Sequence, residues 1–298
     1  MKTSPLSGLV IRTAIVRRPD LGFIYACDPK LEAEEVPHTI IFKWKAGTFI
    51  KGDCEYDAHT VCAIEKPEPS LVDASGPGFY TINARSGKIT SDIFQDSQPP
   101  PKKRRIGGIR SVAEIQGKAY AVGLRGMVYR LDKVRLWQRI DEGLPETFNI
   151  QASHGFQSSD IYAVGRFGQL WQYNGEAWRH RELPTNVNLT SVKCAEDGNV
   201  YVAGHAGVLL RGRLDKWDVI DHKATNDDIW DVEWFDGKLF VSTFKNVYRL
   251  NGKDLEPINF GTDKPKSCYQ LSAANGVMWS NGEFDVMSFD GRTWTRVV

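Results

Sequence analysis

Long hydrophobic runs are absent from this sequence. No apolar stretch approaches the ~18–20 residues that a membrane-spanning helix requires. The first twenty residues, MKTSPLSGLVIRTAIVRRPD, lack both an uninterrupted apolar core and a small-residue cleavage pattern, so a secretory signal peptide is not predicted. We therefore expect neither a membrane-spanning nor a secreted protein.

Cysteine is scarce and follows no spacing pattern. The chain has five cysteines, an odd number, and no two of them form a CxxC pair. Scattered cysteines of this kind are typical of reduced, mostly buried thiols rather than of a disulfide framework or a zinc site. We expect a cytoplasmic protein that holds no metal.

An excess of either charge is also missing. The 38 lysines and arginines nearly cancel the 37 aspartates and glutamates, which leaves a net charge of +1. A nearly neutral chain has no general attraction to nucleic acid or to an anionic membrane surface. We therefore expect neither of them as a partner, although local charged patches remain open.

Catalytic motifs are missing too. The six histidines form no HExxH pattern, and the chain contains no GxSxG elbow, no Walker loop and no GxGxxG that opens a helix. Arginines and tyrosines are frequent, but no motif brings them together as a sialidase-like site would require. We expect no catalytic residue and no cofactor.

Helical periodicity is absent, whereas a strand-rich repeat is plain. A strand that ends in small residues before a tight turn occurs five times, and successive copies end 42, 39, 39 and 38 residues apart. The copies are Tyr120–Gly123, Tyr162–Gly165, Tyr201–Gly204, Phe240–Thr243 and Met278–Asn281. A period of ~40–45 residues built from strands is typical of a β-propeller.

Each repeat contains four short strands, named a to d in chain order, which together make one propeller blade. The N-terminal third supplies two further sets of four, and the last set is complete within residues 268–298. The sequence therefore predicts an all-β fold, a seven-bladed β-propeller of four-stranded antiparallel blades in a single domain, 1–298. The expected blades are 8–52, 56–96, 106–140, 147–183, 188–221, 228–259 and 267–298.

A low-complexity stretch rich in proline and basic residues spans residues 95–108. Its composition predicts an exposed connection between two blades. Pro101–Arg105 resembles a basic import signal or an anion-contacting patch, and a merely solvated loop is the alternative.

The segment Ile161–Leu170, followed by Trp178, resembles the repeats of the BNR and photosystem-assembly-factor propellers. Ser288–Trp294 resembles the Asp box of those repeats shortened by one residue. The resemblance covers roughly residues 109–298 and implies the fold, not an activity. It also implies a binding or inhibitory role, because stand-alone bacterial propellers of this kind include immunity proteins that neutralise a neighbour's toxin.

Aromatic residues recur on strand d at the blade spacing. The positions are Trp137, Trp178, Trp217 and Trp294, with Leu255 in the sixth unit. Identical placement in successive blades favours packing between blades over a row of sugar-binding rings.

The turns between strands b and c carry charges that differ from blade to blade. Propeller geometry places these turns on one face with the d–a connections, so we expect a positive surface with one acidic end. The residues are Arg125, Arg166, His205 and Lys245, followed by Glu283 and Asp285. Such a surface would steer an acidic protein partner into place, and simple solvation of polar turns is the alternative.

The connection Asn226–Trp234 adds carboxylates and indoles to the same face. Asp227, Asp228, Trp230 and Trp234 are candidate partner-binding residues, because tryptophan is enriched at interface hot spots. Strand alternation predicts Trp230, Val232 and Trp234 on one side and Asp231 and Glu233 on the other. A polar channel lining is the alternative role.

These observations favour a non-catalytic scaffold that recognises a protein partner through this face and is monomeric without it. An inhibitor or immunity protein against a bacterial toxin is the most concrete form. Two alternatives stay open: an enzyme, hydrolase or lyase, that acts on a glycan or small molecule in the central channel, and an assembly factor. Two carboxylates ~5–9.5 Å apart in a concave pocket would favour glycoside hydrolysis.

Overall fold

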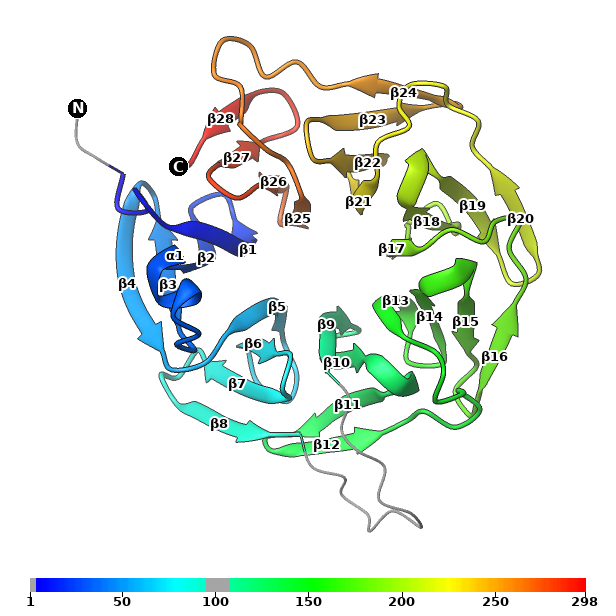
Figure 1. The fold of residues 1–298 in the computed structure, drawn as a ribbon, viewed down its shortest axis with the longest axis horizontal. Coiled ribbons are helices and arrows are strands. Elements are labelled where there is room, and N and C mark those ends of the chain that lie inside the picture. The colour runs from blue at the N-terminus through cyan, green and yellow to red at the C-terminus, as the bar shows by residue number, and fades with distance from the viewer. Residues whose placement is uncertain (1–3, 95–107) are drawn as a thin grey trace. The chain divides into compact units, whose positions relative to one another are not determined.

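A computed structural model describes residues 4–94 and 108–298 of the chain. In these two ranges the protein folds into seven four-stranded antiparallel sheets, each built from four consecutive strands (Figure 1). The prediction of an all-β, seven-bladed β-propeller is confirmed. The basic stretch Pro101–Arg105 lies outside the described residues.

The strands follow the chain blade by blade. Blade 1 contains β1 (Val10–Arg18), β2 (Leu21–Cys27), β3 (Thr39–Lys45) and β4 (Thr48–Cys54), with the short helix α1 (Pro29–Ala33) between β2 and β3. Blade 2 contains β5 (Ala58–Ile64), β6 (Ser70–Ser75), β7 (Phe79–Ala84) and β8 (Ile89–Ile93). Blade 3 contains β9 (Ile109–Ile115), β10 (Lys118–Gly123), β11 (Val128–Lys133) and β12 (Leu136–Arg139).

Four further blades complete the series. Blade 4 contains β13 (Ile150–Gln157), β14 (Asp160–Gly165), β15 (Leu170–Tyr173) and β16 (Trp178–Arg181). Blade 5 contains β17 (Leu189–Cys194), β18 (Val200–Gly204), β19 (Leu209–Arg213) and β20 (Lys216–Val219). Blade 6 contains β21 (Ile229–Phe235), β22 (Lys238–Thr243), β23 (Val247–Asn251) and β24 (Asp254–Pro257). Blade 7 contains β25 (Gln270–Ala274), β26 (Val277–Asn281), β27 (Val286–Phe289) and β28 (Trp294–Arg296).

The chain divides into two compact units, which are described separately. Unit 1 comprises Met1–Ala58, Ala203–Leu209 and Ile220–Val298, so it holds blades 1, 6 and 7 and the b–c turn of blade 5. Unit 2 comprises His59–Val202 and Leu210–Val219, which hold blades 2, 3 and 4 and most of blade 5.

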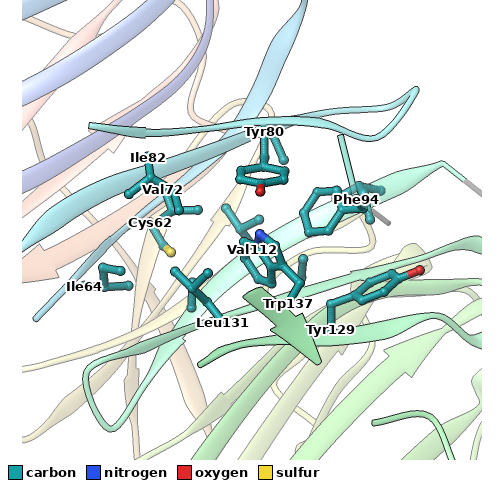
Figure 2. Packing of buried hydrophobic residues seen from close by; sticks show 14 of the residues in the cluster. Cys62, Ile64, Val72, Tyr80, Ile82, Phe94, Val112, Tyr129, Leu131 and Trp137 are labelled. Atoms are coloured by element: carbon teal, nitrogen blue, oxygen red, sulfur yellow. The ribbon is translucent and has the colours of Figure 1, made fainter. Parts of the chain in front are cut away.

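In unit 2, the outer-strand tryptophans pack against the preceding blade. Trp137 of blade 3 lies beside Tyr80 and Phe94 of blade 2, with ring centroids 5.5 and 4.7 Å away (Figure 2). The Trp178 indole of blade 4 is buried and donates a 2.7 Å hydrogen bond to the Ile140 carbonyl of blade 3. The prediction that these rings pack between blades is confirmed for Trp137 and Trp178, since burying a large ring on both sides favours adhesion of neighbouring sheets.

In unit 1, blade 7 docks against blade 1 without exchanging a strand. The four strands of blade 7 come from Gln270–Arg296, as the sequence predicts, and β1 stays in the sheet of blade 1. The Ile11 N–H donates to the Glu283 carbonyl at 2.8 Å, which links the two blades at one end. At the core, the buried Trp279 ring lies edge-on to Trp44, with centroids 5.5 Å apart.

Candidate partner-binding site

The b–c turns of blades 3, 4 and 5 share one conformation. Each is a single 3-10 turn flanked by glycines: Leu124–Gly126, Arg166–Gly168 and His205–Gly207. The middle residue is left-handed in every case, with φ of 64° at Arg125, 60° at Phe167 and 54° at Ala206. Arg125 therefore matches Phe167 rather than Arg166, and the predicted equivalence of Arg125 with Arg166 and His205 is wrong by one residue.

Each of these turns is held by a side chain that precedes strand a of the next blade. In each case an amide or carboxylate oxygen accepts a hydrogen bond from the backbone N–H of the middle turn residue. The pairs are Arg125 N to Asn149 Oδ1 at 3.4 Å, Phe167 N to Asn188 Oδ1 at 3.1 Å and Ala206 N to Asp228 Oδ1 at 2.9 Å. Asp228, a predicted binding residue, thus has a structural role that asparagine fills in the other two blades.

The predicted cations of the turns face local carboxylates. Arg125 pairs with Glu146 at 2.8 Å, and Lys245 lies 4.0 Å from Asp227. His205 Nδ1 lies 3.9 Å from Asp228 Oδ2. Exposed pairs such as these contribute little to stability, but they offset the positive charge that the sequence predicts. Within the described residues, Arg166 has no ion-pair partner.

Four aromatic rings form a row on the side of unit 1 that carries the b–c turns, here called its turn side. The row consists of His205, Trp230, Tyr269 and Phe244, joined edge to face with centroid distances of 6.0, 5.8 and 5.3 Å in that order. We call it the aromatic row. Trp230 is 39% exposed and Phe244 is 42% exposed, although large rings are normally covered. The exposed part of the row is therefore a surface with the composition of an interface hot spot.

A β-bulge pushes Trp230 out of its strand. In the pairing of β21 with β22, Ile229 faces Thr243 and Asp231 faces Ser242, so Trp230 is the extra, unpaired residue. Trp234 pairs with Leu239 at the hairpin end of β21 and does not join the aromatic row. The prediction that regular alternation groups Trp230 with Trp234 is wrong, because the bulge interrupts the alternation.

A cavity of about 300 Å³ lies beside the aromatic row, entirely within unit 1. Strands β21, β25 and β1, the first strands of blades 6, 7 and 1, run next to one another here. The lining includes Trp230, Tyr269, Gln270, Asn281, Glu283 and Arg12. Burial and the negative charge of Glu283 both raise the pKa of the Tyr269 hydroxyl, so this phenol stays protonated and neutral.

The two predicted acidic residues of blade 7 have different surroundings. Asp285 is buried, accepts the Lys266 N–H at 2.6 Å and pairs with the Arg296 guanidinium, so it holds the turn together. Glu283 lines the cavity and is half-buried, and its carboxylate makes no ion pair with any residue that the structure describes. Glu283, rather than Asp285, is the carboxylate available to a ligand.

Sequence reasoning missed the residues that complete this site. Tyr269 precedes strand β25 and Asn281 ends strand β26, so in the sequence both look like ordinary core positions. Phe244 carried a readable signal, since a phenylalanine in a short b–c turn has no strand neighbour to cover it.

Two properties bear on the class of site. Among residues 4–94 and 108–298, no three or more histidine, cysteine, aspartate or glutamate side chains gather closely enough to hold a metal ion. In the same ranges, the structure contains no helix with the length and apolar character needed to cross a membrane.

Comparison with curated proteins decides the family. The chain is 36% identical, over 312 aligned positions, to the immune protein Tsi7 of Pseudomonas aeruginosa, and the match covers 99% of both chains. This chain belongs to the Tsi7 family. No protein-family model matches it.

Solved structures confirm the propeller but share little sequence with this Tsi7 relative. The WD40 β-propeller domain of Doa1 superposes with a TM-score of 0.67 at 7% identity, covering 97% of this chain and 92% of that one. YCF48, solved with a D1 peptide, gives a TM-score of 0.68 at 12% identity, covering 94% and 91%. The predicted resemblance to photosystem-assembly-factor propellers is therefore confirmed for the fold.

Proposed function

We propose that this protein is an immunity protein, a non-catalytic propeller that binds a protein toxin and neutralises it. The observation that carries the proposal is its full-length relationship to the immune protein Tsi7, which extends over 99% of both chains. A propeller is a rigid scaffold that serves many functions, so the function comes from the relative and from the site rather than from the fold.

The binding surface is the turn side of unit 1, around the aromatic row and the cavity. His205, Trp230, Lys245, Asp227 and Glu283 belong to this surface, and Asp228 holds one of its turns. Exposed rings next to charged groups are the side chains that dominate protein interfaces. Arg125 and Arg166, in equivalent turns of unit 2, are proposed contacts that act through charge.

A carboxylate pair for glycoside hydrolysis receives no support at this cavity. Among the described residues that line it, Glu283 is the single carboxylate. Glycosidases need two such groups, one as acid and one as nucleophile or base. The site therefore favours binding over hydrolysis.

Several further properties belong to the proposal. The chain is a single domain, 1–298, monomeric without its partner, and it binds neither nucleic acid nor membrane. All five cysteines lie in the described part of the chain and are free, which supports a cytoplasmic location. The near-zero net charge supports a protein partner over nucleic acid.

Affinity capture followed by a toxicity test examines the proposal. The tagged full chain is used to capture partners from extracts of its source organism, and each captured protein is expressed in a susceptible bacterium with and without the chain. We expect one captured protein to arrest growth, the chain to relieve that arrest, and the two to form a stoichiometric complex. Captured proteins that are harmless, or toxicity that the chain leaves unchanged, would refute an immunity function.

A matched control separates specific protection from expression effects. Lys51→Glu changes an exposed residue on the outer strand β4, whose ammonium group lies 3.4 Å from Asp53. This variant should protect cells as well as the natural chain, because the residue belongs to neither the aromatic row nor the cavity.

A further inference from the structure

We propose that the cavity beside the aromatic row receives an arginine side chain of the toxin. This inference rests on the proposed immunity function and names the chemistry by which the site recognises its partner. The cavity combines the three features that a guanidinium group requires, namely an uncompensated carboxylate, a buried acceptor and aromatic walls.

The carboxylate is that of Glu283. It has no ion-pair partner among the described residues, and it lines the cavity from the b–c turn of blade 7. Its own backbone is held at both ends: its N–H donates to Ser267 Oγ at 3.0 Å, and its carbonyl accepts from Ile11 N at 2.8 Å. A fixed backbone limits the region that the carboxylate can reach to the cavity and its rim, which suits charge-assisted hydrogen bonds to a cation.

The buried acceptor is the side-chain oxygen of Asn281. This residue is only 2% exposed, it lines the cavity, and its Oδ1 has no hydrogen-bond partner. Buried polar atoms are nearly always paired, because an unpaired one loses its hydration without compensation. A donor that enters the cavity would satisfy this oxygen, and a guanidinium carries five N–H donors, enough for both Asn281 and Glu283.

The aromatic walls are Trp230 and Tyr269. The bulge exposes Trp230 beside the cavity, and Tyr269 lies edge-on to it at 5.8 Å. Guanidinium groups stack on such rings more readily than ammonium groups do, because they are planar and weakly hydrated. The walls therefore favour arginine over lysine.

The cation already present in the cavity does not reverse this preference. Arg12 forms an ion pair with Glu32, and its Nε donates to Cys27 Sγ at 3.2 Å. The Glu32 carboxylate in α1 therefore compensates the charge of Arg12. Among the described residues that line the cavity, Glu283 remains the charged group without a counter-ion. The volume of about 300 Å³ is at the lower end of small-ligand sites, so it fits one side chain rather than a folded segment.

Titration with capped amino acids tests the cavity without any toxin. The ¹⁵N-labelled full chain is titrated with N-acetyl-arginine methylamide, and the Trp230 indole N–H resonance, assigned with Trp230→Phe, is followed. We expect a saturable shift with the arginine probe, none with the neutral citrulline analogue, and weaker binding of the lysine analogue. An absent shift, an equal citrulline response or equal lysine affinity would each overturn the assignment.

Glu283→Gln is the decisive variant, and Glu196→Gln is its control. Glu196 is an exposed carboxylate in the hairpin of blade 5 and does not line the cavity. We expect Glu283→Gln to weaken arginine binding by about tenfold or more, since it removes the charge from a partly buried charge pair. Unchanged binding in a variant that melts at the natural temperature would count against the proposal.

The same variant in the toxin assay distinguishes the inference from the proposed function. We expect Glu283→Gln to weaken the complex with the captured toxin by about tenfold or more. Full affinity of this variant for a toxin that the chain neutralises would remove the inference and leave the immunity function standing. Arginine binding that depends on Glu283, in a chain that neutralises no toxin, would remove the function and leave only a guanidinium pocket.

Discussion

The b–c turns of blades 3 to 5 differ in length from the b–c turns of blades 6 and 7. In blades 3 to 5, a backbone hydrogen bond joins residues four positions apart and closes the turn, as from the Gly165 N–H to the Gln169 carbonyl at 3.1 Å. In blades 6 and 7 the closing bond spans three residues, from Thr243 N to Asn246 O at 2.8 Å and from Gly282 N to Asp285 O at 3.0 Å.

The difference shows that some turns of this repeat protein stabilise the fold, whereas others leave side chains available to a partner. In the turns of blades 3 to 5, here called the regular turns, backbone polar groups form hydrogen bonds with one another and with the capping side chains Asn149, Asn188 and Asp228. The shorter turns leave Phe244 and Phe284 exposed and place Glu283 beside a cavity. Phe167, 73% exposed in a regular turn, is the exception and allows the two kinds of turn to be compared.

The regular turns should tolerate change least. A Cβ on Gly168 would overlap the Thr185 carbonyl, and its φ of 67° disfavours any other residue. We expect Gly168→Ala to lower the free energy of unfolding by about 3 kcal/mol, from overpacking added to backbone strain. Urea denaturation measures it, with Gly252→Ala as the control, because Gly252 has φ of 64° and open space around it. Equal losses in the two variants would show that the turn is not tightly packed.

The aromatic row should carry binding rather than stability. Trp230→Ala removes an exposed ring, so we expect the toxin complex to weaken by about 2 kcal/mol or more while the melting temperature barely moves. Calorimetric titration of the captured toxin measures the affinity. Phe167→Ala removes a more exposed ring, next to the proposed contact Arg166, and we expect it to weaken the complex less than Trp230→Ala does. A larger loss in Phe167→Ala would move the interface to the regular turns.

The capping role of Asp228 should depend on its oxygen and not on its charge. Asp228→Ala leaves the Ala206 N–H without its 2.9 Å acceptor, and we expect a loss of about 1 kcal/mol in the free energy of unfolding. Asp228→Asn should cost almost nothing, because asparagine fills this position in two other turns. Thermal and urea unfolding of both variants provide the comparison. If Asp228→Asn is as damaging as Asp228→Ala, the carboxylate charge matters and the comparison of turns fails.

The exposed ion pairs of the turns should have the smallest effect. Arg125→Ala breaks the 2.8 Å contact with Glu146, and we expect a change below about 0.5 kcal/mol in the free energy of unfolding. Association with the toxin, followed by stopped flow at low and high salt, should slow only slightly. If Arg125→Ala slowed association strongly at low salt and much less at high salt, that result would support the positive surface that the sequence predicts.

Much of the fold was predictable because a repeat shows the same physical solution several times. The small residues and glycines that end strand b recur at blade spacing, and the tryptophans of strand d recur with them. The candidate site was less predictable, since its residues are the ones that break the repeat. His205, Lys245 and Glu283 were found by position, whereas Tyr269, Phe244 and Asn281 were not.

The sequence by itself determined the number of blades, the strands of each blade and the positions of the turns, because these follow from local backbone preferences repeated along the chain. Only the tertiary structure decided which turn residues are free to bind. The bulge exposes Trp230, burial leaves Asn281 Oδ1 unpaired, and ion pairs occupy Asp285 and Arg12. These features depend on strand register and on side-chain packing in three dimensions, which the pattern of a single repeat cannot reveal.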